Sequence, residues 1–311
     1  MKVVVTGGAG FIGANLCREL ACVHPSTDIV VVDDVSTGHW SNLTGVDVDR
    51  REGSILDPSL LSSACSGADA IVHLAARGSV PRSLADPVAT HEVNVTGTVR
   101  VLEAARGNGS CQVVMASSSS VYGANPALPK SEDLACRPMN PYAASKLAAE
   151  SYALGYQHSY GLPVLAFRFF NVFGPMQPAG HTYAAVIPSF VSAALAGRPL
   201  QIFGDGKQSR DFTYVGSVVK ALVVAVSGRM VSPTPVNLAF GTQRNLLEVV
   251  SALESLLGHP VAVDHVAPRN ADVTHSSAEP GALRALLPDI APWDFMDGLA
   301  KTVEWFRSIE S

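Results

Sequence analysis

The chain has 311 residues, of which 47% are hydrophobic and 16% are charged, and its formal net charge is −5. So apolar a composition excludes a disordered chain, and an excess of acidic over basic residues argues against a nucleic-acid-binding protein. No stretch approaches the roughly 18 consecutive apolar residues of a membrane span, and the first strand pattern breaks at Gly7 before a signal-peptide core can form, so we expect a cytoplasmic protein.

The first half of the chain alternates strand and helix patterns. Short β-branched or apolar runs predict strands at residues 2–6, 29–33, 70–74, 111–116 and 162–169. Helical apolar spacing predicts helices at 11–23, 87–106 and 141–159, the last with a proline in its first turn. Strands separated by helices imply right-handed βαβ units, and the low charge favours strands buried on both faces. The expected fold is α/β, a Rossmann-type doubly wound parallel sheet.

The second half is less regular and is punctuated by proline and glycine. Helices are expected at 184–196, 215–226, 246–257 and 295–308. A composition shift near residues 171–178 predicts a first domain of residues 1–170 and a smaller α/β domain made mainly of residues 171–311. The shift also allows the chain to cross between the two domains more than once.

The cysteines are five in number, scattered, and without a Cys-x-x-Cys pair. Their spacing fits neither a disulfide framework nor a zinc site. We therefore expect buried, inert thiols in a reducing compartment, and no metal. The residues are Cys17, Cys22, Cys65, Cys111 and Cys136.

A glycine-rich turn follows the first predicted strand and opens the first predicted helix. It reads Gly7-Gly8-Ala9-Gly10-Phe11-Ile12-Gly13. Gly7 and Gly10 permit a tight turn and the close approach of a pyrophosphate, and Gly13 lets the helix pack close to the strand. Free N–H groups at the helix N-terminus favour the phosphates. This context predicts dinucleotide binding rather than a merely tight turn.

Asp33 ends the second predicted strand, twenty residues beyond Gly13. A carboxylate there hydrogen-bonds the adenosine ribose hydroxyls and repels a 2′-phosphate, so NAD is favoured over NADP. Asp34 beside it strengthens the sign of this argument. The alternative is that Asp33 only ends the strand.

Tyr142 and Lys146 lie one helical turn apart at the start of a predicted helix. A tyrosine has an ordinary pKa near ~10, and a nearby ammonium together with oxidised nicotinamide lowers it toward the working range. Lys146 can also hold the nicotinamide ribose. Serines 117–120 follow a predicted strand at the sheet edge where ligands bind, and one of them can hydrogen-bond the hydroxyl that Tyr142 deprotonates. Taken alone, the spacing also fits a packed tyrosine beside a surface lysine.

With these residues, the chain resembles the NAD-dependent epimerase/dehydratase family of extended short-chain dehydrogenases/reductases. More narrowly, it resembles the nucleotide-sugar epimerases of the UDP-glucose 4-epimerase type. The resemblance spans nearly the whole chain and rests on an ordered set of motifs: residues 7–13, Asp33, His73-Leu74-Ala75-Ala76, Asn94, residues 117–123, Tyr142 with Lys146, and residues 168–175, 204–212 and 268–272.

The resemblance implies a catalytic trio of Ser118, Tyr142 and Lys146. It implies an NAD-binding first domain with cofactor contacts at Gly7, Gly10, Phe11, Ile12, Gly13, Asp33, Ser54, Ile55, Leu74, Ala75, Ala76, Asn94, Tyr142 and Lys146. It implies a nucleotide-sugar-binding second domain, with substrate contacts at Ser118, Ser119, Asn171, Ala185, Arg210, Arg269 and Ser276. The two arginines are fork-shaped donors suited to a diphosphate, although Arg210 alone also fits a salt bridge to Asp211.

One motif departs from the family pattern. The family often has an aspartate after the third strand that contacts adenine, whereas this chain has Gly53-Ser54-Ile55. How adenine is held therefore stays open, through Ser54 or through backbone. Asp57 is too far along the chain to take the aspartate's place. Whether the substrate nucleotide is UDP or dTDP also stays open.

The resemblance favours a 4-epimerase that works through a 4-keto intermediate with tightly bound NAD. Dehydratases and decarboxylases of the superfamily usually carry an acid just before Val-Tyr-Gly, where this chain has Ser119 and Ser120. A UDP-glucuronate 4-epimerase stays open, with Arg77, His181 or Thr182 against a C6 carboxylate. So does a nucleotide-sugar reductase or dehydrogenase that releases its cofactor. The intact trio argues against a non-catalytic NAD-binding protein.

Sugar choice follows from pocket size. In the family, the position seven residues after the second phosphate-binding arginine limits the sugar, and a tyrosine there disfavours an N-acetyl group. This chain has Ser276 there, and Gly78, Ser119 and Ala185 are similarly small. We expect UDP-glucose and UDP-galactose, with room for UDP-GlcNAc and UDP-GalNAc. The resemblance also implies a homodimer formed by helices near 88–105 and 142–160, with no nucleic-acid or membrane partner.

Overall fold

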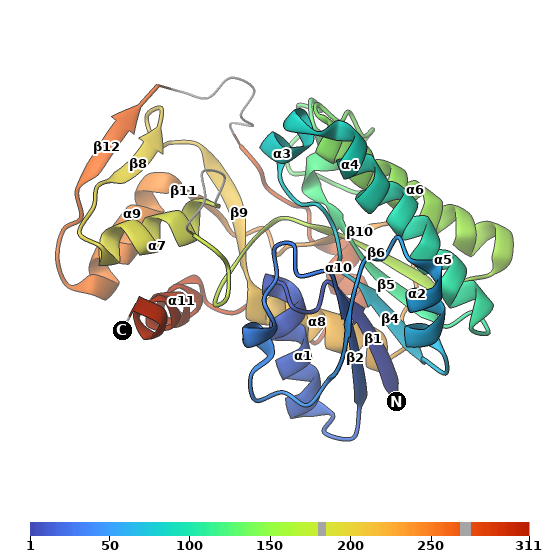
Figure 1. Ribbon diagram of the computed structural model, residues 1–311. Helices are drawn as coiled ribbons and strands as arrows, with labels where there is room; N and C mark the ends of the chain where they lie inside the picture. Colours follow the sequence, from blue (N-terminus) through green and yellow to red (C-terminus); the bar gives the residue numbers. More distant parts are fainter. Residues whose placement is uncertain (180–184, 268–274, 311) are drawn as a thin grey trace.

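The computed structural model describes residues 1–179, 185–267 and 275–310, and a seven-stranded sheet dominates it (Figure 1). The strand order is β10-β6-β5-β4-β1-β2-β3, and every neighbouring pair is parallel. The bounds are β1 (Lys2–Thr6), β2 (Asp28–Asp33), β3 (Asp49–Glu52), β4 (Ala70–His73), β5 (Gln112–Ser118), β6 (Val164–Phe169) and β10 (Val236–Leu238). The expected α/β doubly wound parallel sheet is confirmed.

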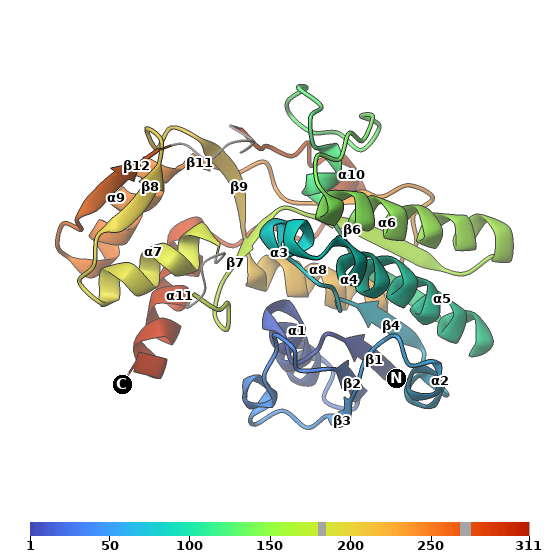
Figure 2. The same ribbon diagram turned by 45° about the horizontal axis from the view of Figure 1, so that its top comes forward.

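Helices cover both faces of this sheet (Figures 1 and 2). Val3 and Val5 of β1 join the core beneath α1 (Phe11–Val23) and α8 (Val215–Ser227). Val4, which points the other way, joins the core beneath α2 (Pro58–Cys65), α5 (Gly97–Gly107) and α6 (Pro141–Tyr160). Alternate side chains of a strand face opposite sides, so a sheet covered twice needs strands that are apolar throughout. This explains the low charge of the sequence.

The helix expected at 87–106 is one run with a change of pitch. It consists of α4 (Pro87–His91), a π-helical turn η2 (Glu92–Thr96) and α5. π-Helical turns are rare overall, but those that occur are often found at functional sites. Asn94 lies in this one. A short helix that the sequence patterns did not predict, α3 (Val80–Ala85), precedes α4.

The chain leaves the large sheet after β6 and builds a smaller part, which lies beside it in Figure 1. One small sheet contains β7 (Asn171–Phe173), β9 (Ser209–Tyr214) and β11 (Gln243–Asn245), and another pairs β8 (Leu200–Phe203) with β12 (Val263–Val266). The helices are α7 (Val186–Leu195), α9 (Leu246–Leu257) and α11 (Phe295–Glu310). Between these elements, α8 and β10 return to the large sheet, and α10 (Gly281–Leu286) packs beside β10.

Within residues 1–179, 185–267 and 275–310, no helix combines the length and the apolarity that a bilayer crossing requires. The same residues contain no group of histidine, cysteine and acidic side chains placed to hold a metal ion. Cys17, Cys65 and Cys111 are buried free thiols, as expected. Cys22 is exposed and Cys136 is half-buried, so the expectation that all the thiols are buried is wrong.

Candidate active site

A cavity of about 1580 Å³ lies at the carboxyl edge of the large sheet. The glycine loop after β1, the end of β2 and the loop after β4 border it, together with the end of β5 and the first turn of α6. Residues 171–179 and α7 close it from the smaller part. Ligands bind at this edge in doubly wound sheets because the connecting loops leave a crevice there.

The glycines of the first loop do what their spacing predicts. Gly7 has φ +72°, and a Cβ there would lie 2.6 Å from the backbone nitrogen of Ala75. A Cβ at Gly13 would lie 2.3 Å from the carbonyl oxygen of Gly7, so the helix packs too closely for any side chain. Gly10 lines the cavity, and a Cβ there would meet one atom, the Gly7 oxygen, at 3.2 Å. The loop therefore forms a cradle open to the cavity, which fits a dinucleotide pyrophosphate.

Asp33 joins the end of β2 to the glycine loop and also lines the cavity. Its Oδ2 accepts a hydrogen bond from the Ala9 backbone nitrogen at 2.9 Å, and its Oδ1 accepts one from Val35 nitrogen at 2.8 Å. Burial raises the pKa of Asp33, and these two hydrogen bonds oppose the rise. The carboxylate therefore shapes the glycine loop while it lines the cavity, and its contact with a ribose stays a prediction.

Most of the other residues expected at the cofactor also line the cavity. They are Phe11, Ile12, Ser54, Ile55, Leu74, Ala75 and Ala76. Asn94 is not among the lining residues. It is buried, and its Oδ1 accepts from the Arg77 backbone nitrogen at 2.7 Å while its Nδ2 donates to Ser145 Oγ at 2.9 Å. Asn94 therefore ties the loop after β4 to α6.

Ser118, Tyr142 and Lys146 come together as expected. Asn140 caps α6 by accepting the Ala143 N–H at 2.9 Å, which sets Tyr142 in the first turn. Ser118 and Tyr142 share a side-chain hydrogen bond. Because Ser118 Oγ already accepts from the backbone nitrogen and the hydroxyl of Ser120, its own hydrogen is free for Tyr142.

Burial acts on the pKa values of both Tyr142 and Lys146 in the protein alone. Burial raises the pKa of Tyr142, and the hydrogen bond with Ser118 only opposes the rise. In the protein alone, the pKa of Tyr142 therefore lies above its ordinary value. That Lys146 and oxidised nicotinamide together lower it stays a prediction. Burial lowers the pKa of Lys146 to about 8, against the opposing charge of Glu150. Desolvation penalises the charged form of each group, so it raises the pKa of the phenol and lowers the pKa of the ammonium.

The residues expected at the substrate are divided between two places. Asn171 and Ala185 line the cavity. Arg210 lies on β9, where its Nη1 donates to Ser209 oxygen at 2.9 Å, and the Ser276 backbone nitrogen donates to the same oxygen at 3.0 Å. Neither of them, nor Ser119, is among the residues that line the cavity.

Asn171 reaches toward the same strand. Its Nδ2 donates a hydrogen bond to the backbone carbonyl oxygen of Asp211 at 3.3 Å. The Asp211 carboxylate accepts hydrogen bonds from the backbone nitrogens of Gly241 and Ala278. Three residues expected at the substrate or its carboxylate lie outside the described residues: Arg269, His181 and Thr182.

The cavity also contains residues that the sequence patterns did not single out. Ser36, Thr37, His39 and Asn42 follow β2 and line its cofactor end, and Asn42 Nδ2 donates to Ala9 oxygen at 2.9 Å. The sequence could have indicated these residues by their position just after Asp33, the acidic end of β2. Trp305 and Phe306 of α11 line the opposite part, and no local pattern marks them, because α11 reaches the cavity only through tertiary packing.

A pyrophosphate cradle, an acidic strand end and a Ser–Tyr–Lys set around one cavity define a dinucleotide-dependent enzyme of the short-chain dehydrogenase/reductase kind. Residues 3–239 match the model of the NAD dependent epimerase/dehydratase family. The chain belongs to this family, and its cofactor is NAD.

Relatives of the chain cover several reactions. The chain is 39% identical to the UDP-glucose 4-epimerase of Mycolicibacterium smegmatis, over 99% of each chain. It superposes with a TM-score of 0.93 on the UDP-N-acetylglucosamine 4-epimerase of Methanobrevibacter ruminantium M1, at 34% identity over 99% of this chain and 98% of that one. It is also 32% identical to the UDP-N-acetyl-alpha-D-glucosaminuronate decarboxylase of Bacillus cytotoxicus, over 100% of this chain and 99% of the relative.

Proposed function

We propose that this enzyme is a UDP-sugar 4-epimerase. One observation carries the proposal. Among the described residues that line the cavity, the only carboxylates are Asp33 and Asp34, at its cofactor end. Elimination or decarboxylation after oxidation is assisted by an acid near the sugar, whereas epimerisation needs only reversible hydride transfer and one acid–base group. Ser118, Tyr142 and Lys146 supply that group without an added carboxylate.

NAD, when bound, supplies the acceptor and later the donor of the C4 hydride. Tyr142 takes the proton of the sugar 4-hydroxyl. Ser118, whose single hydrogen bonds Tyr142 in the protein alone, would turn that hydrogen to the oxygen of the sugar hydroxyl when the substrate binds. With NAD bound, Lys146 would hold the nicotinamide ribose, and its charge together with that of the oxidised nicotinamide would favour the phenolate. The 4-keto sugar then turns about its diphosphate, and Tyr142 returns the proton to the oxygen on the other face. This turn requires a firmly held diphosphate, for which Arg210 and Arg269 are the donors, and a loosely held hexose.

We propose UDP-glucose and UDP-galactose as substrates, in a sugar pocket that also accepts the N-acetylated pair. The positions expected to limit the size of the sugar carry small residues: Gly78, Ala185, Ser119 and Ser276. Gly78 and Ala185 line the cavity, so no large side chain fills this part of its wall. A bulky residue at any of these positions would take up volume that an acetamido group needs.

A UDP-glucuronate 4-epimerase is the second candidate, and Arg77 is the observation that favours it. Arg77 and Arg82 both line the cavity. Arg77 Nη2 lies 3.6 Å from the Asp86 carboxylate, while its Nε is buried and lacks a hydrogen-bond partner. A buried donor without a partner is costly, and a carboxylate on the sugar would satisfy it.

One experiment separates these candidates. Purified enzyme is incubated with UDP- and dTDP-linked hexoses, N-acetylhexosamines and uronates, and the C4 configuration is read by NMR. The proposal expects inversion of the UDP-hexoses with no net NADH. Inversion of UDP-glucuronate alone favours the second candidate. Net formation of NADH, or loss of water or carbon dioxide, would show a dehydrogenase, dehydratase or decarboxylase instead.

We propose a homodimer formed through α4, α5 and α6. This face carries large apolar side chains exposed to solvent, with Val88 66% exposed and Tyr160 56% exposed. Leu84 of α3 and Tyr152 of α6 add to it. Two copies that pack these helices together would cover the patch. Light scattering should give twice the 32.5 kDa chain mass, and Val88→Asp should shift the protein toward monomer.

A further inference from the structure

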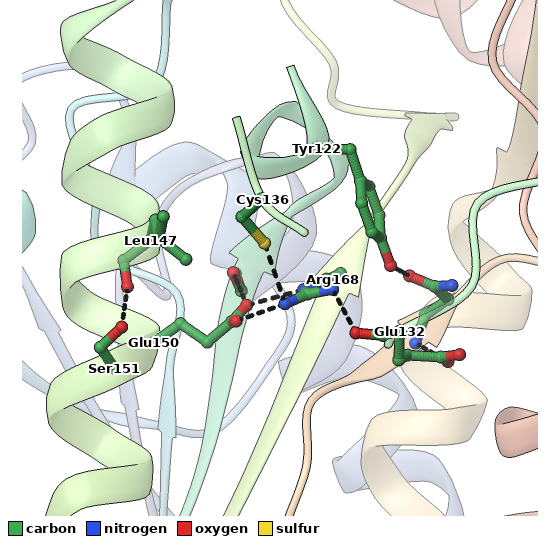
Figure 3. Close-up of polar contacts among 9 residues, drawn as sticks. Tyr122, Glu132, Cys136, Leu147, Glu150, Ser151 and Arg168 are labelled. Carbon is green, nitrogen blue, oxygen red and sulfur yellow. Dashed lines mark hydrogen bonds and ion pairs between the residues drawn. The ribbon is translucent and has the colours of Figure 1, made fainter. Parts of the chain in front are cut away.

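A buried ion pair begins one helical turn beyond Lys146. Glu150 follows Lys146 by four residues on α6, so both side chains lie on one face of the helix. The Glu150 carboxylate accepts two hydrogen bonds from Arg168 of β6, from Nε to Oε2 at 3.0 Å and from Nη2 to Oε1 at 2.7 Å (Figure 3). Each side chain is only 4% exposed.

The same carboxylate reaches the strand that carries Ser118. Ser117 Oγ donates to Glu150 Oε2 at 2.6 Å. Ser117 and Arg168 are register partners across β5 and β6, and the next residue along β5 is Ser118. A single buried group therefore fastens the helix of Tyr142 and Lys146 to the ends of two neighbouring strands.

Arg168 is itself fixed on all sides, as Figure 3 shows. Its guanidinium lies 4.7 Å from the ring centroid of Tyr122. Its Nη1 donates a hydrogen bond to the backbone carbonyl oxygen of Glu132 at 3.3 Å, and its Nη2 lies 3.4 Å from Cys136 Sγ. A guanidinium held in this way fixes the Glu150 carboxylate in one position through two parallel hydrogen bonds.

Stability alone does not account for such a pair. A buried ion pair is a weak source of stability, because the cost of removing two charges from water cancels much of their attraction. Glu150 also faces a second cation, Lys146, whose ammonium it stabilises against burial. A carboxylate that is bonded to a structural arginine and also acts through space on Lys146 has a role that an apolar pair would not fill.

We propose that Glu150 is a positioning residue of the active site, a role that rests on the proposed epimerase function. Its carboxylate, held by Arg168, keeps Lys146 in its ammonium form and, through Ser117, keeps Ser118 within reach of Tyr142. Neither Glu150 nor Arg168 contacts the substrate in this role. Both act through the three residues that do.

The other groups that face Lys146 do not titrate near neutral pH. His73 of β4 faces it, and burial lowers the pKa of His73 to about 3, so this ring is neutral. The pKa of Tyr142, on the same helix, lies above its ordinary value. Burial also raises the pKa of Cys136, which contacts Arg168. Asn94, Ser117 and Ser118 carry no charge. Among the described groups, a change in the titration near pH 8 therefore reports Lys146.

Glu150→Gln removes the charge with little change in shape. The pKa of Lys146, followed by NMR of its side-chain carbon and assigned with Lys146→Met, should fall by about one unit, a tenfold change in the protonation ratio. The alkaline limb of the kcat profile should move to lower pH by a similar amount. Asp49→Asn, which breaks the exposed Asp49–Arg51 pair, should change neither readout.

Glu150→Gln leaves Arg168 buried without its partner, so a double variant guards against unfolding. Glu150→Leu with Arg168→Met removes both charges and should keep a thermal midpoint near that of the wild type. If the role is positioning, the lower Lys146 pKa persists in this folded variant. If either folded variant titrates like the wild type, the proposal is wrong. The NMR titration needs no turnover, so a wild type that inverts no sugar contradicts only the proposed function.

Discussion

The hydroxyl of Thr6 and Nδ1 of His73 lie 2.7 Å apart, on the register pair that joins β1 to β4. On the other side of the ring, Nε2 lies 3.0 Å from the hydroxyl of Thr98. Thr6 Oγ1 also accepts the Ala75 N–H at 3.4 Å. A buried histidine thus links the two strands whose following loops border the cavity.

This histidine makes stability depend on pH. Burial lowers the pKa of His73 to about 3, whereas the unfolded chain binds a proton there below its ordinary value of 6.5. The contribution of His73 is present above pH 6.5 and is lost as the pH falls toward 3. When the pH falls from 7 to 5, the loss of this contribution should lower the free energy of unfolding by about 2 kcal/mol. In urea unfolding, the free energy of unfolding of His73→Gln should fall between pH 7 and pH 5 by about 2 kcal/mol less than that of the wild type. An equal fall in both proteins would contradict the prediction.

Tyr142→Phe keeps the ring and removes the acid–base group. We expect kcat for epimerisation to fall by about 10²–10⁴-fold, because general acid–base catalysis contributes that much. NAD binding, measured by calorimetry, should change little. Tyr152→Phe, at an exposed position on the same helix, is the matched control and should keep wild-type turnover. A fully active Tyr142→Phe enzyme would exclude the proposed role.

Asp33→Asn tests the choice of cofactor. The variant keeps one acceptor oxygen for the Ala9 or Val35 N–H and loses the charge that repels a 2′-phosphate. Hydrogen bonds to a charged group contribute about 1.5–3 kcal/mol, so NAD affinity should fall by about 10–100-fold. NADP affinity should fall less or rise. Calorimetric titrations with both cofactors measure the ratio, and an unchanged preference would show that Asp33 only shapes the loop.

Ser276→Tyr tests the size of the sugar pocket. The backbone of Ser276 is held beside Arg210 on β9, so a larger side chain there extends next to the expected diphosphate site. We expect kcat/KM for UDP-GlcNAc to fall by at least about tenfold, with a smaller effect on UDP-glucose. The UDP-glucose rate of the same preparation is the internal control. Equal losses on both sugars would mean that this position does not select by size.

Gly13→Ala tests the cradle. The added methyl group would lie 2.3 Å from the Gly7 oxygen, so the loop or the start of α1 must shift. Such overpacking costs about 1–3 kcal/mol, and NAD affinity should fall with it. Gly107→Ala, where the methyl group meets no atom within 4 Å, is the control and should leave the thermal midpoint and NAD affinity unchanged. An unperturbed Gly13→Ala protein would show that close packing is not the reason for this glycine.

The sequence determined the parts of this protein that depend on local pattern. Helices α1 and α9 begin and end at the residues that apolar spacing predicts. The glycine loop, Asp33 and the pair of Tyr142 and Lys146 are marked by short spacings, so the sequence indicates them as candidates and the structure places them around one cavity. The short strands β7, β8, β9, β11 and β12 were not predicted, since they contain polar or charged residues and lack the continuous apolar run that marks β1, β2 and β4.

Only the tertiary structure decided how these parts act on one another. It showed Asn94 bonded to Arg77 and Ser145 rather than lining the cavity, because contacts between distant segments leave no local pattern. It showed that burial raises the pKa of Tyr142 in the protein alone, since desolvation depends on everything packed around a group. It also joined Glu150 to Arg168 and Ser117, residues that are far apart in the chain. Spacing along a sequence places side chains on a face, and burial and distant neighbours then decide their charge.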